Sequence, residues 1–199
     1  MATLTKTQGT SLISLQSIAS NTVVISAAQD VSTALAATIF IHFGRRITTA
    51  LTEGMEFRIE ASSKATLNGH WYPLASFKTA IALAETEAIT PGESAAATVI
   101  RMASTTNLVV GDIVFFDNAT IANGEFHRIK AVSANVSVTI EDGLLNAQAD
   151  TTPILDQAEM FVAQVDLTAI GRIRLVADGR NTGQAVAVEA TMVTGDSIA

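Results

Sequence analysis

Four side chains that could support acid–base or metal chemistry lie close together in one part of the sequence: Asp112, Asp117, Glu125 and His127. Glu125 and His127 are two residues apart, so on a strand they point to the same side. Across a hairpin they could meet Asp112 or Asp117, and a carboxylate beside an imidazole is the pairing that general-base catalysis uses. Charged pairs across strands are also common on sheets that have no catalytic role. The segment is therefore either a small site or a hairpin whose polar residues face water.

Turn chemistry favours the second interpretation of residues 111–132. Gly111–Asp112 is typical of a strand entry, Asp117–Asn118 of a strand end, and Asn123–Gly124 of the turn between two strands. The return strand would then carry its polar side chains on the exposed side of the sheet, namely Glu125, His127, Arg128 and Lys130. The sequence has no cysteine, and His42, His70 and His127 show no metal-ligand spacing. It also has no nucleotide-binding or nucleophile motif. We expect no catalytic, cofactor-binding or metal-binding residue and no enzymatic activity.

Two further groups of residues have alternative interpretations. His42 lies in the apolar run 38–43, which favours a hydrogen-bonded histidine of the sheet over a ligand. Trp71 and Tyr72 are the only Trp and Tyr, and on a strand they point to opposite faces. One ring would then lie in the core and the other at the surface, unless the pair forms an aromatic contact with a protein or a sugar.

Charge and hydropathy exclude two classes of partner. The formal net charge is −7, and 12 Lys and Arg residues form no basic stripe, so we expect no nucleic acid partner. Arg45–Arg46, with Arg172 and Arg174, fit solvated strand faces or salt bridges to an acidic partner. No apolar stretch approaches the roughly 18 residues of a spanning helix, so we expect no membrane partner.

Alternation with a period of two indicates strands along most of the chain. Residues 55–61 place Met55, Phe57, Ile59 and Ala61 on one side and charged residues on the other. The same pattern occurs in 136–141 (with Val136, Val138 and Ile140 inward), in 172–178 and in 184–193. Apolar runs at 38–43 and 112–116 predict strands that are covered on both faces. Residues 79–88 contain helix formers but no clear capping residue, so we expect little helix.

Turn signals and junctions indicate how the strands are organised. Asn-Gly and Asp-Gly pairs predict hairpins at 67–70, 122–125, 141–144 and 177–183. Junctions rich in small residues and proline at 89–98 and 146–156 set off a middle unit of four or five short strands. We therefore predict an all-β fold: an antiparallel, jelly-roll-like β-sandwich from residues 1–88 plus 157–199, with a small β-barrel inserted at 89–156. A single continuous sandwich is the alternative.

The middle segment also carries a resemblance. "LVVGDIVFFDN" (108–118) and "GEFHRIKAVSANVSVTIEDGLLNAQ" (124–148) resemble virion proteins of tailed bacteriophages, and the flanks 30–46 and 183–197 are similar to small phage structural proteins. The resemblance implies a capsid decoration (cement) protein, or else a tail or baseplate component. It implies a homo-oligomer, with a trimer favoured, that contacts the major capsid protein or other virion subunits. The expected location is the virion, assembled in the host cytoplasm.

Three functional hypotheses follow. The first is a non-enzymatic virion structural protein, whose polar residues 1–14 would be an arm that is loose alone and pairs with a neighbour's sheet, or else simply a disordered terminus. The second is a carbohydrate-binding β-module that uses Trp71, Tyr72 and the turns at Asp117 and Asn123. The third is a small enzyme that acts through Asp112, Glu125 and His127.

Overall fold

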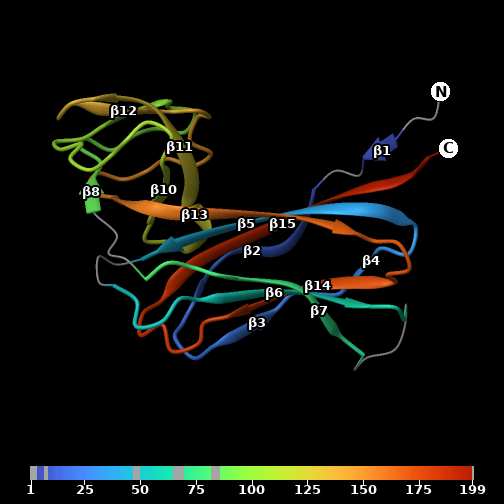
Figure 1. Ribbon diagram of the computed structural model, residues 1–199. Helices are drawn as coiled ribbons and strands as arrows, with labels where there is room; N and C mark the ends of the chain where they lie inside the picture. Colours follow the sequence, from blue (N-terminus) through green and yellow to red (C-terminus); the bar gives the residue numbers. More distant parts are fainter. Residues whose placement is uncertain (1–3, 7–8, 47–49, 65–69, 82–85, 199) are drawn as a thin grey trace.

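The chain folds almost entirely into antiparallel β-strands, as predicted (Figure 1). The computed structural model describes residues 4–6, 9–46, 50–64, 70–81 and 86–198. Within these ranges the only helix is the short 3-10 turn η1, and no helix is long and apolar enough to cross a membrane. The strands are β1 (Leu4–Lys6), β2 (Thr10–Ile18), β3 (Val23–Ile25), β4 (Gln29–Asp30), β5 (Ala34–Arg45), β6 (Glu56–Ser62), β7 (Tyr72–Lys78), β8 (Thr86–Ala88), β9 (Val99–Arg101), β10 (Ile113–Phe116), β11 (Glu125–Ser133), β12 (Ser137–Ile140), β13 (Pro153–Asp166), β14 (Arg172–Asp178) and β15 (Val186–Ile198), and η1 is Ile121–Asn123.

Two sheets hold all of these strands. The larger sheet has ten strands in the order β1-β15-β5-β13-β10-β11-β12-β9, with β2 paired to β15 and β8 paired to β13. The smaller sheet has five, in the order β3-β14-β6-β7, with β4 paired to β14. In Figure 1 the smaller sheet lies beneath one half of the larger sheet, and the other half of the larger sheet curls up into a separate lobe.

The sandwich core lies between β14 and β6 on one side and β15, β5 and β13 on the other. Alternation explains its composition, because every second residue of these strands points inward. Ile39, Ile41 and Phe43 of β5 are fully buried, and so are Phe57 and Ile59 of β6. The inward pattern predicted for residues 55–61 is therefore confirmed.

The lobe is built by the curled end of the larger sheet around a second core. Val114, Phe116, Ile129, Val138 and Ile140 are all buried in it. The curl brings the β9 end of the sheet back towards β13, because Met102, just after β9, forms an isolated bridge with Ile89, just after β8, and β8 pairs with β13. We call this lobe the barrel. The division of the chain at 88/89 and 156/157 stays a prediction, and β13 continues from the barrel into the sandwich sheet.

The barrel packs directly on the outer side of the sandwich sheet. Phe115 of β10 is fully buried there with Leu155 and Ala187, in a third apolar cluster. Gly44 of β5 makes the close approach possible, since a Cβ atom at this position would lie 2.9 Å from the Cβ of Phe115. The junction is therefore a packed interface as well as a covalent connection.

Several predictions about individual segments are wrong. Residues 4–6 and 10–14 pair with β15 of the same chain, so they form no loose arm; residues 1–3 and 7–8 lie outside the described part. Val136 is 58% exposed because it lies in the turn before β12, rather than inside the strand. The signals at 141–144 and 177–183 connect strands that do not pair with each other. Residues 122–125 do lie in the connection of a hairpin, β10–β11, whereas most of 67–70 is outside the described residues.

Candidate functional site

The β10–β11 hairpin does not bring its four chemical side chains together. Its register pairs Ile113 with Arg128 and Phe116 with Glu125, so Asp112 and Glu125 lie at opposite ends of the hairpin. An Asp112 carboxylate oxygen accepts a hydrogen bond of 3.0 Å from the backbone amide of Val109. Asp112 is thus a turn residue at the strand entry, and its predicted meeting with Glu125 and His127 does not occur.

Glu125 is a buried carboxylate that organises a distant loop. Its side chain is only 3% exposed. One oxygen accepts hydrogen bonds from the amide of Leu145 (2.7 Å) and Nε2 of His127 (2.9 Å). The other accepts them from the amide of Asn146 (2.7 Å) and Nε2 of Gln148 (3.1 Å). Burial raises the pKa of Glu125, but hydrogen bonds from the Leu145 amide, from His127 and from the Asn146 amide outweigh burial and lower the pKa below its usual range.

This bonding contradicts the prediction that Glu125 and His127 decorate an exposed strand face. The His127 side chain is 8% exposed, and its ring meets the edge of Phe116 at a centroid distance of 5.4 Å. Both Glu125 oxygens are already fully engaged, which leaves no free lone pairs for an incoming substrate. Within the described ranges, no three His, Asp or Glu side chains are grouped so that they could hold a metal ion. Of the four polar residues predicted to face solvent here, Lys130 is exposed, while Arg128 is half-buried.

Asp117 links the barrel to the sandwich. One of its carboxylate oxygens lies 2.8 Å from Nε of Arg46, which follows β5. Burial raises the pKa of Asp117, while the hydrogen bond from Arg46 acts in the opposite direction. The neighbouring Arg45 is 2% exposed, so the prediction of a solvated strand face fails for it. Burial lowers the pKa of Arg45, and Glu159 and Asp156 partly offset that effect.

The remaining histidines and aromatic residues form no shared site. His42 is half-buried and stacks on Phe126 of the barrel at a centroid distance of 5.3 Å, so it belongs to the junction. His70 is exposed. Trp71 is not in the core: the guanidinium of Arg174 lies 4.2 Å from its ring centroid and that of Arg172 lies 5.2 Å away. Tyr72 is 64% exposed, as expected for one ring of the pair.

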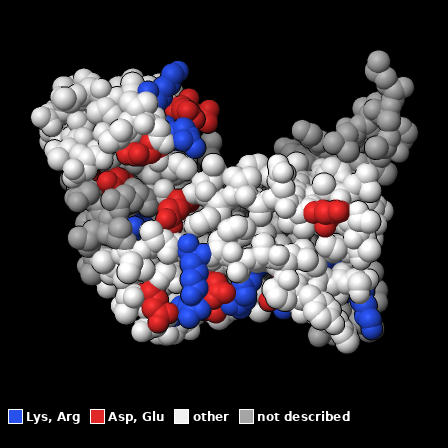
Figure 2. All heavy atoms as spheres, in the orientation of Figure 1, with Lys and Arg blue, Asp and Glu red and all other residues white. Residues whose placement is uncertain are grey.

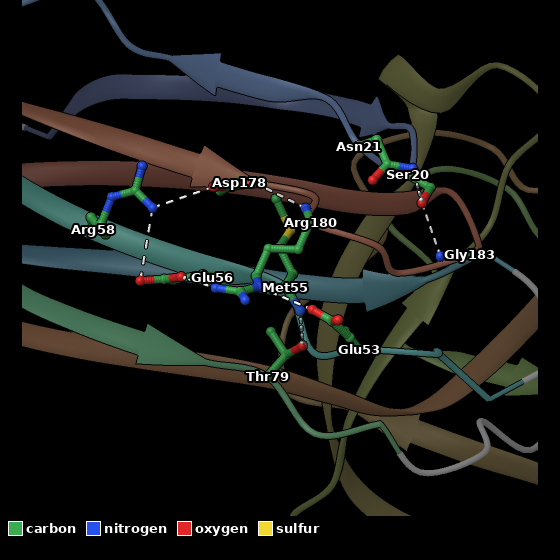
Figure 3. A network of polar contacts seen from close by, with 10 residues as sticks. All are labelled: Ser20, Asn21, Glu53, Met55, Glu56, Arg58, Thr79, Asp178, Arg180 and Gly183. Carbon is green, nitrogen blue, oxygen red and sulfur yellow. Dashed lines mark hydrogen bonds and ion pairs between the residues drawn. The ribbon is translucent and has the colours of Figure 1, made fainter.

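The outer face of the smaller sheet carries paired charges over β6 and β14, as Figure 3 shows for part of it, and Val23 and Ile25 of β3 are exposed at its edge. Arg58 lies 3.3 Å from Asp178, Arg174 lies 2.7 Å from Glu60, and Arg180 lies 2.6 Å from Glu56. We call this surface the ion-pair face; its residues are Glu53, Glu56, Arg58, Glu60, Arg174, Asp178 and Arg180. Most of these side chains are half-buried, and each charge on the face has a partner of opposite sign.

The outer face of the larger sheet carries few charges: Asp166, which pairs with Ala36, lies at one end and Glu189, which pairs with His42, lies at the other. The register places Phe40 of β5 between Thr191 of β15 and Val162 of β13, and it places Thr38 between Val193 and Gln164 in the next row. These side chains alternate with the buried Ile39 and Ile41, so they point away from the core. We call this surface the neutral face and define it as Thr38, Phe40, Met160, Val162, Gln164, Thr191 and Val193. Val162 is 47% exposed and Met160 is 37% exposed.

The neutral face lies in a hollow beside the barrel. Figure 2 shows this hollow in profile, with uncharged atoms along its floor. Small residues deepen the floor at its far end, where a cavity of about 260 Å³ is lined by Ala36, Phe40, Val193 and Gly195 among others. Towards the barrel, the row that contains Met160 also holds His42 and Glu189. Burial raises the pKa of Glu189 and lowers that of His42, so burial favours the uncharged form of both.

A second group of exposed apolar side chains lies on loops of the barrel, where Arg128 donates a hydrogen bond to the carbonyl of Gly111 and Arg101 pairs with Ser137 at the border. Residues 102–111 and 131–140 contain no charged side chain. The amide of Asn135 donates a hydrogen bond of 2.9 Å to Oγ1 of Thr105, and the amide of Met102 donates one of 3.0 Å to the carbonyl of Val136, so the two loops are tied together. Val109, Val110 and Val136 are each 58–59% exposed on these loops. We call this surface the barrel tip.

Comparisons with known proteins identify no family. No protein-family model matches the chain, and no curated protein matches it. Among solved structures, the chain is similar to the SPBc2 prophage-derived protein YomS, with 9% identity, 97% of this chain and 96% of that chain covered, and a TM-score of 0.31. It is also similar to VP17, a capsid protein of bacteriophage P23-77, with 10% identity, 99% and 100% covered, and a TM-score of 0.21. A third is VP2 of the infectious bursal disease virus subviral particle, with 8% identity, 98% of this chain but 42% of that chain covered, and a TM-score of 0.23. These structural neighbours therefore include a prophage protein and viral capsid proteins, but at these TM-scores the likeness carries no functional weight.

Proposed function

We propose that the chain is a non-enzymatic structural protein of a virus particle and that its neutral face binds a neighbouring virion subunit. The observation that carries this proposal is the contrast between the two outer faces of one sandwich. Residues 108–148 add the resemblance to phage virion proteins, which favours a decoration protein of the head that stabilises the capsid as a homo-oligomer, with a trimer as the expected form. A tail or baseplate component would use the same face in the same way.

The contrast matters because the free energy of removing a side chain from water differs in sign between apolar and charged groups. Burying a charged side chain costs several kcal/mol unless it is paired in the interface, whereas burying apolar surface releases roughly 25 cal/mol per Å². The ion-pair face is suited to solvent. The neutral face exposes Met160 and Val162 with no ionised side chain among its seven residues, which is the composition of an interface centre.

A charge placed on the neutral face tests the proposal. Val162→Lys introduces an ammonium group at a position that is 47% exposed, so folding is expected to persist, while docking would require the charge to be desolvated. We expect purified particles to carry many copies of the wild-type chain and to lose Val162→Lys. Ser76→Lys, at an exposed position of β7 in the other sheet, is the matched control and should be retained. Wild-type protein that is absent from particles, or Val162→Lys retained as fully as Ser76→Lys, would refute the proposal.

A carbohydrate-binding module remains a second candidate only through Tyr72, whose ring is 64% exposed. The adjacent Trp71 already has the guanidinium groups of Arg172 and Arg174 over its ring, which reduces its value as a stacking platform for a sugar. Loss of glycan-array binding in Tyr72→Ala would support this candidate, and an array with no signal for the wild-type protein would remove it.

A further inference from the structure

We infer that the crevice beside Glu189 receives a lysine or arginine side chain of a neighbouring virion protein that is a different chain from this one. The inference rests on the proposed function, because it names the chemistry of the subunit that docks on the neutral face. Two observations carry it: a carboxylate without a partner at the border of that face, and an apolar crevice around this carboxylate.

Glu189 lies at the barrel end of the neutral face. It is opposite His42 of β5, and His42 is opposite Met160 of β13, so the three outward side chains form one row. Glu189 is half-buried. Among the described residues its carboxylate accepts no hydrogen bond and forms no ion pair, and burial raises its pKa. A carboxylate that has lost water without gaining a donor is unfavourable, so a cation supplied by a partner would stabilise it.

The crevice beside this carboxylate suits the aliphatic part of a basic side chain. It has a volume of about 190 Å³, and its apolar lining comes from Leu15, Phe126 and Leu145. Leu145 is 82% exposed although it is apolar. Glu125 and His127 also line the crevice, but they are bonded to each other. Lys and Arg combine a long apolar stem with a charged end, so the stem can pack on Leu145 while the charge meets the free carboxylate.

The surrounding charges favour a basic partner over a second copy of this chain. None of the described residues that line the crevice is Lys or Arg. The opposite corner of the sheet face holds Asp166, and the barrel wall carries Glu141 and Asp142 with one base, Arg128, which lies 3.9 Å from Glu141. A second copy would bring a further net charge of −7 to this acidic border, whereas a protein with basic residues around an apolar centre is attracted to it.

Glu189→Gln tests the contact, because it removes the charge and keeps the shape of the side chain. Glu53→Gln on the ion-pair face is the matched control, since the Glu53 side chain is 46% exposed. Purified particles that carry each full-length variant are washed with increasing NaCl, and the retained copies are counted by mass spectrometry. We expect the retained fraction of E189Q to be about tenfold below that of E53Q, because a desolvated charge pair loses one partner.

Unfolding of the isolated variant separates docking from a structural role. The Glu189 carboxylate has no donor among the described residues, so E189Q should be at least as stable to urea as the wild-type chain. A lower stability of E189Q would show that Glu189 serves the fold of this chain, and it would overturn the inference.

Photo-cross-linking identifies the occupant of the crevice. Ala122 is exposed and lines the crevice, and the natural chain has no cysteine, so Ala122→Cys provides a single thiol there. The A122C protein is labelled with benzophenone maleimide, assembled on particles and irradiated. We expect a product that joins this chain to a different virion protein, at a peptide that contains Lys or Arg. A product of two copies of this chain, or no product, would overturn the inference.

Failure of the inference is distinguishable from failure of the proposed function. Equal retention of E189Q and E53Q, on particles that carry the wild-type chain, would overturn the basic contact while the virion role stands. Absence of the wild-type chain from particles would refute the virion role itself.

Discussion

At the scale of single residues, Glu125 is the polar side chain with the clearest task. Its two oxygens accept four hydrogen bonds, and two of the donors are the amides of Leu145 and Asn146, about twenty residues further along the chain. Buried donors that lose their acceptor cost free energy, because they have already given up water. Glu125 therefore fixes the 144–148 loop against the barrel and acts as a structural carboxylate.

Replacing Glu125 by Gln tests this role. The amide group of Gln has one acceptor and one donor end, so the backbone amide of either Leu145 or Asn146 must lose its acceptor, whichever way the group is oriented. We expect the free energy of unfolding to fall by about 2–4 kcal/mol. Glu141→Gln is a suitable control, because Glu141 is 52% exposed and lies 3.9 Å from Arg128. Urea unfolding of the two variants measures the difference, and equal stability of E125Q and E141Q would contradict the assignment.

The lowered pKa of Glu125 also predicts how the stability difference between wild type and E125Q depends on pH. The pKa of Glu125 is lowered in the folded state, so its contribution is complete above the unfolded value of about 4.3. That contribution is lost as the pH falls through the lower folded-state pKa. The stability difference between wild type and E125Q should therefore be constant near neutral pH and shrink in acid. A stability difference that grows as the pH is lowered would show that folding raises, rather than lowers, the pKa of Glu125.

At the scale of elements, the junction between the barrel and the sandwich depends on Gly44. A methyl group at this position would lie about 3 Å from both Phe115 and Phe126, and both of these rings are packed in the junction. Gly44→Ala should therefore lower the free energy of unfolding by about 1–3 kcal/mol, as expected for overpacking. Gly9→Ala is the control, because its Cβ would meet nothing closer than 3.8 Å. Thermal melting of both variants checks this prediction. A G44A protein with the same melting temperature as G9A would contradict it.

The elements also show which features the sequence predicts. The strand at 55–61 is predicted correctly because only one of its faces is buried. The buried Met55, Phe57 and Ile59 therefore alternate with charged residues in the sequence. Burial of Glu125 is not predictable from its neighbours, since three of its four partners come from a loop about twenty residues away. The neutral face could not be predicted from the sequence either. The three strands that form it, β15, β5 and β13, come from distant parts of the chain, and each strand contributes only two or three residues to the face.

At the scale of the whole molecule, the fold presents two different exteriors. One sheet of the sandwich carries ion pairs on its outer side, while the other presents the neutral face beside the barrel. The proposed function rests on this difference between the two outer faces.

A density map of the assembled particle, with this chain traced in it, tests the central claim most directly. We predict that the chain is present in many symmetry-related copies, with Phe40 and Val162 covered by a neighbouring subunit and with Arg58 and Arg174 facing solvent. Particles that lack the chain, or copies in which the neutral face lies open while the ion-pair face is buried, would contradict the claim.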